Sequence, residues 1–220
     1  MPPCPDPDLY IAVKTKNGFI WRRRRGTVKP AKVNDVLAAF ANNAKVSMPA
    51  AKRLLLKLRP FSAGFDMRGS VQRFASRFSK SIMVEGSMSW SFFAGLDINY
   101  TYPLRRRLHA DYRVVIEKNT VSISIPVKDS MINKERNRDI TAFFFELIMV
   151  SGDPADERSL RTESDTSAYY PVCNNKPATC RLCLQLPENK PYMVMLKWAC
   201  IEGKLTAGPR YMGMKVVEVG

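Results

Sequence analysis

Histidine, cysteine and carboxylate side chains are the residues of this 220-residue chain that could carry catalysis or hold a metal ion. His109 is the only histidine, so a histidine-rich metal site is excluded and any Ser/His/Asp or Cys/His arrangement would have to use it. It lies in a linker-like stretch, PLRRRLHADY, and no G-x-S-x-G motif accompanies it. We interpret His109 as a surface residue.

Four of the five cysteines lie in the last third of the chain, with a spacing that a zinc site could use. Cys173, Cys180 and Cys183 form a C-x₆-C-x₂-C pattern, and Cys200 could supply a fourth thiolate. However, CRLC runs directly into LQLP and is typical of a strand, where positions i and i+3 face opposite sides. We therefore expect no metal site. An odd number of cysteines without a secretory signal indicates free thiols in a reducing, cytoplasmic compartment.

Carboxylates for acid–base chemistry are present, but their spacing selects no pair. The candidates are Glu85, Asp97, Asp111 and Glu146. No G-x-x-x-x-G-K-[ST] or G-x-G-x-x-G motif indicates a nucleotide site. The sequence therefore predicts a protein that is not an enzyme and has no cofactor. An enzyme would need a pocket around His109, or two carboxylates that folding brings together.

The positive charge is the unusual feature of the composition. The net charge is +15. Residues 1–81 hold 17 Lys and Arg against 4 Asp and Glu, whereas residues 82–220 hold 18 against 16. Such an asymmetry favours an N-terminal surface that meets a polyanion or an acidic patch of a partner protein. No stretch of 18 apolar residues is present, so we expect no membrane span.

The N-terminal part combines an extended leader, a hairpin and helices. Residues 1–8 are proline-rich. LYIAVKT and FIWRRRR flank Asn17-Gly18, a strong hairpin signal. Apolar periodicity predicts one helix through Val33, Phe40 and Ala44 and a second from an N-cap at Ser47, with Pro49 in its first turn, to Pro60. A third is predicted from about residue 68 to 82, with basic residues off the apolar stripe.

Strand patterns follow from about residue 84. YRVVIEKNTVSISIPV alternates around Lys118-Asn119, which predicts a second hairpin. Further strands are predicted at ITAFFFELIMVSGD, ATCRLCLQLP, YMVMLKWACIEGKL and RYMGMKVVEVG. The polar segment DPADERSLRTESDTSAYYP, residues 153–171, is predicted to be a surface loop. We predict an α+β fold: a basic hairpin and helices over residues 9–83, followed by an antiparallel β-sandwich over residues 84–220.

The order of these features resembles an uncharacterised bacterial family of Bacteroidota, described as domains of unknown function. The resemblance rests on NGFIWRRRRG, the basic helical segment, FFAGLDINYTYPL, the hairpin YRVVIEKNTVSISIPV and the closing strand pair. It implies a short basic β-segment and helices before a β-sandwich of immunoglobulin-like character. It implies no activity and no site residues.

The leading hypothesis is a non-enzymatic binding or assembly protein whose basic N-terminal face engages a polyanion, above all nucleic acid. Arginine and lysine would contact phosphates, and an aromatic side chain could stack on unpaired bases. The candidates are Trp21, Arg22, Arg23, Arg24, Arg25, Lys29, Arg53, Arg73 and Arg77. The alternative is a structural or scaffolding protein of a phage-like or mobile-element assembly, which acts through protein contacts and self-association at sandwich edges.

Overall fold

The computed structural model describes residues 10–16, 18–23, 35–106, 108, 111–128, 131, 139–156, 158–172, 178–203 and 205–220, and for residues 23 and 35–37 only the backbone. The chain divides into two compact units, Met1–Ala39 and Phe40–Gly220. Three of the predicted phosphate-binding residues lie outside the described residues: Arg24, Arg25 and Lys29. His109 and Cys173 lie outside them as well.

The first unit contains the predicted N-terminal hairpin. Strands β1 (Tyr10–Thr15) and β2 (Gly18–Arg23) pair antiparallel, with Thr15 opposite Gly18. Gly18 has a φ of 117°, which a residue with a side chain adopts only under strain. Phe19 and Ile20 are both exposed, as is expected where, among the described residues, two strands form a sheet by themselves.

The part of the chain that the structure describes has two α-helices where three were predicted. The first two predicted helices are one helix, α1 (Asp35–Leu58), which continues through Pro49. Ser47 is not an N-cap: it is fully buried, and its Oγ lies 2.9 Å from Ser79 Oγ. The prediction that Phe40 belongs to an inward stripe is also wrong, since its side chain is 48% exposed. Burial of the helix on both sides of Pro49 offsets the missing backbone hydrogen bond.

Helix α2 (Ser70–Glu85) confirms the third predicted helix and ends at Gly86, which has a φ of 75°. Phe74, Ala75 and Phe78 are buried on the predicted stripe. Phe78 packs on Trp90 and on Phe93 of the short 3₁₀ helix η1 (Ser91–Phe93), with ring centroids 5.6 and 4.8 Å away. This aromatic cluster fixes the orientation of α2, and hence the direction of its outer face.

The described strands of the second unit form two antiparallel sheets. In the larger sheet, β9 lies between β5 and β11, and β6 pairs with the other side of β5. In the smaller sheet the order is β3–β4–β8. The bounds are β3 (Arg113–Glu117), β4 (Thr120–Val127), β5 (Ile140–Ser151), β6 (Arg161–Thr166), β7 (Tyr170–Pro171), β8 (Ala178–Gln185), β9 (Tyr192–Glu202), β10 (Leu205–Thr206) and β11 (Met212–Val219).

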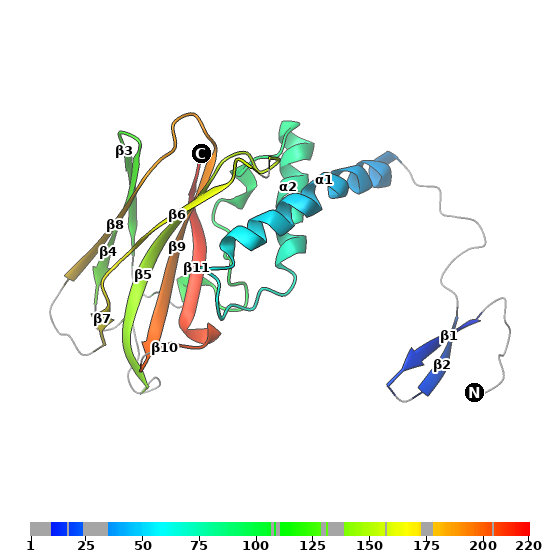
Figure 1. Cartoon of the computed structure of the whole chain (residues 1–220), viewed down its shortest axis with the longest axis horizontal. Coiled ribbons are helices and arrows are strands. Elements are labelled where there is room, and N and C mark those ends of the chain that lie inside the picture. The colour runs from blue at the N-terminus through cyan, green and yellow to red at the C-terminus, as the bar shows by residue number, and fades with distance from the viewer. Residues whose placement is uncertain are drawn as a thin grey trace. The chain divides into compact units, whose positions relative to one another are not determined.

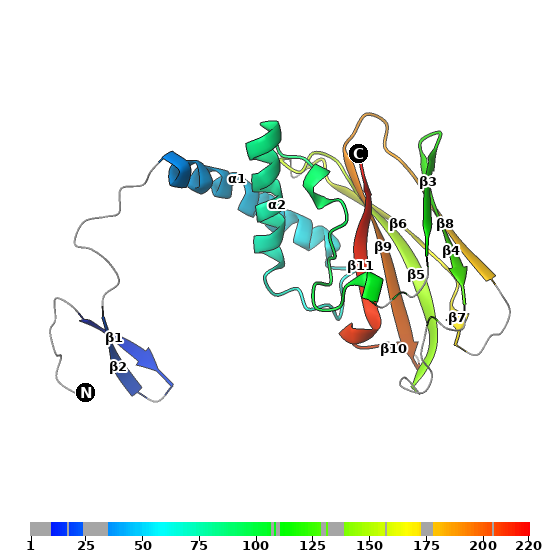
Figure 2. The ribbon, with the colours of Figure 1, turned by 180° about the vertical axis from the view of Figure 1, so that it is seen from behind.

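The second unit has three layers, with a hydrophobic core on each side of the larger sheet. Figures 1 and 2 show α1 and α2 on one side of β5, β9 and β11, and the smaller sheet on the other. Along β5, Phe145 and Leu147 contribute to the core between the sheets, and Ile148 to the core beneath the helices. Burial on both faces explains why β5 reads as a continuous apolar run. The helices and the sandwich thus share a core, and the fold is α+β.

The prediction that residues 153–171 form a surface loop is wrong. Strand β6 pairs with β5 along its whole length, and β7 pairs with β5 further along. At this edge the Asp165 carboxylate accepts the backbone N–H of Cys183 at 2.8 Å and so links β6 to β8 of the other sheet. In the part of the chain that the structure describes, no helix is long and apolar enough to cross a membrane.

Candidate nucleic-acid interface

The predicted phosphate partners of the hairpin lie in the first unit. Arg22 is exposed and Trp21 is half-buried on β2. The side chain of Arg23, and all of Arg24, Arg25 and Lys29, lie outside the described residues. The remaining three candidates, Arg53, Arg73 and Arg77, are helix residues of the second unit.

Arg53 on α1 holds a loop of its own chain. Its Nη2 donates hydrogen bonds to the backbone oxygens of Pro154 (3.2 Å) and Ala155 (3.1 Å), which lie between β5 and β6. Its buried Nε has no hydrogen-bond partner among the described residues. Because its guanidinium is hydrogen-bonded to these carbonyls, we infer that Arg53 fastens α1 to the loop between β5 and β6. We therefore do not include Arg53 in the candidate interface.

Arg73 has a similar structural role at the other helix. Its Nη1 donates to Asp97 O (3.3 Å), and its Nη2 donates to Ser70 Oγ (2.9 Å) and Ile98 O (3.3 Å). Partial burial lowers the pKa of this guanidinium. Its Cζ also lies 5.0 Å from the ring centroid of Tyr100. Arg73 therefore positions an aromatic ring that is 70% exposed.

A groove runs along the outer face of α2 and is the strongest candidate site. It has a volume of about 470 Å³ and is lined by Gln72, Arg73, Ser76, Arg77, Lys80 and Leu96. A second hollow shares Arg73, Arg77 and Leu96 and extends to Asp97 and Tyr100. We call the two together the α2 groove. It forms because positions 73, 77 and 80 share one face of a helix whose opposite face is buried.

The α2 groove combines positive charge with aromatic rings. Lys80 Nζ lies 5.0 Å from the ring centroid of Phe92, and Arg77 lies between this pair and the Arg73–Tyr100 pair along the helix. Neither Arg77 nor Lys80 forms an ion pair with a described carboxylate. Asp97, the one described carboxylate in the lining, accepts the backbone N–H of Leu104 at 2.9 Å. The groove therefore presents cations and an exposed ring, a combination that suits phosphates and bases.

Sequence patterns missed Lys80 and Tyr100 as site residues. Lys80 follows Arg73 by seven positions, so helical spacing was a signal for it. Tyr100 carried no such signal, because only the folded chain brings the segment after η1 beside Arg73.

Another basic hollow, separate from the α2 groove, lies at the end of the sandwich. It has a volume of about 440 Å³ and is lined by Leu104, Arg105, Leu108, Asp111, Tyr112, Lys128 and Lys215. Burial, and to a lesser degree the charge of Asp97, raise the pKa of Tyr112. Asp111 in this lining offsets part of the positive charge of the hollow.

Three of the four carboxylates that could do acid–base chemistry, Glu85, Asp97 and Glu146, have separate partners in the structure. Glu146 forms an ion pair with Lys197 at 2.8 Å, on neighbouring strands where each side chain is nearly buried. Glu85 accepts hydrogen bonds from Ser89 and Ser91, which lower its pKa. No described hydrogen bond joins two of the four candidate carboxylates.

The thiols lie on different faces of the strands. Cys180 is buried and Cys183 is exposed on β8, as the strand pattern predicted, and Cys200 is buried on β9. Burial raises the pKa of Cys200 to about 12, so its thiol stays protonated at neutral pH. Among the described residues, no three His, Cys, Asp or Glu side chains lie close enough together to share a metal ion.

Comparisons with known proteins identify no family for this chain. No protein-family model matches the chain, so the resemblance to a Bacteroidota family stays a prediction. No curated protein matches it either. The solution structure of CsgH from R. palustris has 8% sequence identity and a TM-score of 0.23, over 46% of this chain and 91% of that one. A likeness this slight carries no conclusion about fold or function.

Proposed function

We propose that this protein is a non-enzymatic binding protein whose α2 groove engages a polyanion, namely the phosphate backbone of nucleic acid. The observation that carries the proposal is the alignment of Arg77 and Lys80 in a groove beside Tyr100, with no ion pair to a described carboxylate. Arg77 and Lys80 donate to phosphate oxygens, and Arg73 holds the Tyr100 ring in place for stacking on an unpaired base.

The distribution of charge on the helix layer supports the same proposal. Over residues 35–58 and 70–85 the two helices hold seven Lys and Arg against two Asp and Glu. Phosphate contacts release condensed counterions, which favours binding without sequence preference and makes the affinity depend on salt. In this proposal the arginines Arg22, Arg23, Arg24 and Arg25 and Lys29 supply further phosphate contacts from the first unit.

Binding should be measured by fluorescence anisotropy with labelled single- and double-stranded oligonucleotides of random sequence, at two salt concentrations. We expect the double variant Arg77→Glu/Lys80→Glu to bind at least about tenfold more weakly than the wild type. The slope of log affinity against log salt should fall by about 2, one unit for each phosphate partner lost.

The matched control is Arg181→Glu/Lys190→Glu, which changes the net charge equally at two exposed positions outside the groove. Binding by the control should stay close to that of the wild type. Equal weakening in the two double variants would mean that total charge, not the groove, attracts the ligand. If the wild-type protein binds neither oligonucleotide at low salt, the proposal is wrong.

The hairpin is tested separately with Arg23→Glu/Arg24→Glu. We expect this variant to lose affinity and salt slope in the same way, because the first unit supplies contacts in addition to those of the groove.

A further inference from the structure

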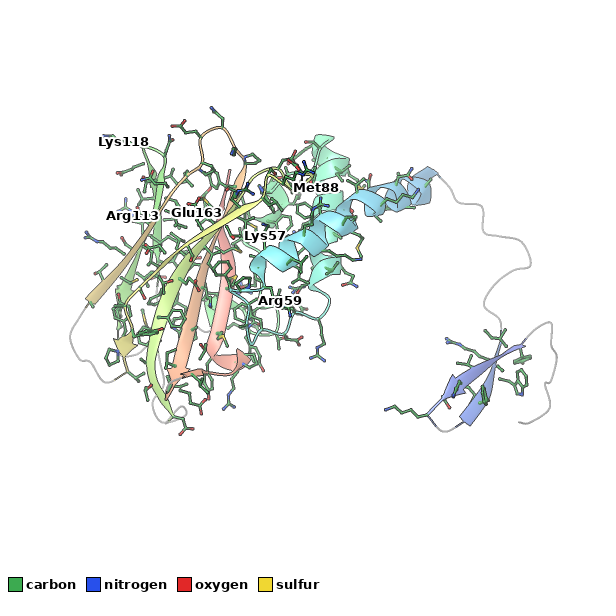
Figure 3. All side chains as sticks on the ribbon, viewed as in Figure 1. Lys57, Arg59, Met88, Arg113, Lys118 and Glu163 are labelled. Carbon is green, nitrogen blue, oxygen red and sulfur yellow. The ribbon has the colours of Figure 1, made fainter. Side chains whose placement is uncertain are left out.

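Strand β3 is an unpaired edge of the second unit. It is the outer strand of the smaller sheet, and no described segment pairs with its free side. The outer side of β11, by contrast, is covered: residues 95–98 bond to it, for example through Ile98 N–H to Met214 O at 2.8 Å. Figure 3 shows Arg113 and Lys118 on the β3–β4 hairpin, on the opposite side of the unit from Lys57 and Arg59 of the helix layer. An uncovered edge is a template for another strand.

The turn of the hairpin determines which backbone groups of β3 are free. Lys118 and Asn119 form a two-residue turn with φ of 45° and 62°, and Glu117 lies opposite Thr120. In such a hairpin the two residues that flank the turn are a hydrogen-bonded pair. The alternation of an antiparallel ladder then points the N–H and C=O groups of Arg113, Val115 and Glu117 toward β4. Those of Val114 and Ile116 point outward.

The five residues of β3, RVVIE, are complementary to themselves in antiparallel register. If two copies pair about Val115, Arg113 of each copy lies opposite Glu117 of the other. Val114 then lies opposite Ile116, and these are the two residues whose backbone groups are free. In this register, centred on Val115, opposite charges face each other, apolar side chains face each other, and the free backbone groups can form hydrogen bonds.

The two faces of β3 also suit this pairing, because its apolar and its charged side chains lie on opposite faces. Val114 and Ile116 lie opposite Ile123 and Val121, which are buried, so both point to the core side of the sheet. Ile116 is nevertheless 46% exposed, and a second copy of β3 would cover it. Arg113 and Glu117 lie on the outer face, where neither forms an ion pair with a described residue. Opposite charges directly across two strands stabilise their pairing, and like charges destabilise it.

We propose that two copies of this chain associate through β3 in antiparallel register, which joins their two three-stranded sheets into one. This dimer does not depend on the nucleic-acid proposal, since β3 lies outside the α2 groove.

The test is the mass of the nucleic-acid-free protein in solution, measured by sedimentation velocity over a range of concentrations. The wild type should have twice the chain mass of 25.0 kDa. Arg113→Glu and Glu117→Arg each place like charges at both ends of the paired strands. Each should weaken the dimer by about tenfold or more and give the mass of a single chain.

Two further samples separate this pairing from a general loss of structure. The double variant Arg113→Glu/Glu117→Arg restores opposite charges and should regain the dimer. An equimolar mixture of the two single variants should form a mixed dimer, because each supplies the charges that the other lacks. A monomeric wild type overturns the proposal, and so does a dimer that is indifferent to both reversals or a mixture that stays monomeric.

Discussion

At the scale of single residues, the arginines of the helix layer differ in what their guanidinium groups contact. Arg53 and Arg73 donate to backbone carbonyls of loops that the helices cover, whereas Arg77 faces the groove. Charge alone does not distinguish a residue that holds a fold together from one that is free to meet a ligand. The difference lies in whether an acceptor of the same chain is within reach.

Replacement of Arg53 should therefore affect stability and not binding. Arg53→Ala leaves the Pro154 and Ala155 carbonyls without this donor, and we expect the free energy of unfolding to fall by about 1–3 kcal/mol. Lys52→Ala, at the exposed neighbouring position, should change it by less than about 0.5 kcal/mol. Urea unfolding measures both. A loss of oligonucleotide affinity in a folded Arg53→Ala protein would contradict the structural role.

At the scale of elements, α1 shows packing prevailing over local preference. Pro49 lacks the N–H that a helix interior needs, and the sequence around it is typical of a helix start. The helix is nevertheless continuous, and Ala50, Ala51 and Leu54 directly after the proline are buried. The apolar contacts of these residues favour the helical path by more than the proline disfavours it.

Removal of the proline should consequently stabilise the protein. Pro49→Ala restores a backbone donor inside α1, which is worth about 3 kcal/mol in a helix interior. The unfolded chain of the variant is more flexible, and this offsets up to about 1 kcal/mol. We expect a net gain of about 2 kcal/mol in the free energy of unfolding. A decrease, measured by urea unfolding, would mean that Ser47 and Pro49 act as a break between two helices.

At the scale of the whole molecule, the net charge is +15, and few of the charged side chains that the structure describes are paired with one another. Over the described ranges there are two ion pairs between side chains, Arg68–Asp66 and Lys197–Glu146. Hydrogen bonds from Arg68 hold the pKa of Asp66 at about 2, so this carboxylate remains charged at neutral pH. Repulsion among the remaining cations opposes the compact state.

The melting temperature should therefore rise with ionic strength. Raising sodium chloride from about 50 mM to about 500 mM shortens the screening length and weakens the repulsion. Tripolyphosphate at equal ionic strength should raise the melting temperature further, because binding to the folded state adds to screening. Differential scanning fluorimetry measures both effects. A melting temperature that is insensitive to both salts would show that the positive charges are far enough apart not to repel.

Local patterns in the sequence determined a large part of this protein. Alternation around Lys118-Asn119 predicted the second hairpin, helical spacing predicted the buried face of α2, and the strand character of CRLC placed Cys180 and Cys183 on opposite faces. These features depend on neighbours within a few residues, which the sequence displays directly. The basic excess near the N-terminus was equally visible.

Only the tertiary structure decided what those elements meet. It joined two predicted helices through Pro49, and it made a strand of the polar β6 because the backbone of β5 offered hydrogen bonds at its edge. It attached Arg53 and Arg73 to carbonyls, set Tyr100 beside the α2 groove and left the outer side of β3 without a partner strand among the described residues. Each of these outcomes depends on contacts between parts of the chain that are distant in sequence. Backbone N–H and C=O groups take part in most of them, and every residue except proline carries both, so the sequence does not show which ones will meet.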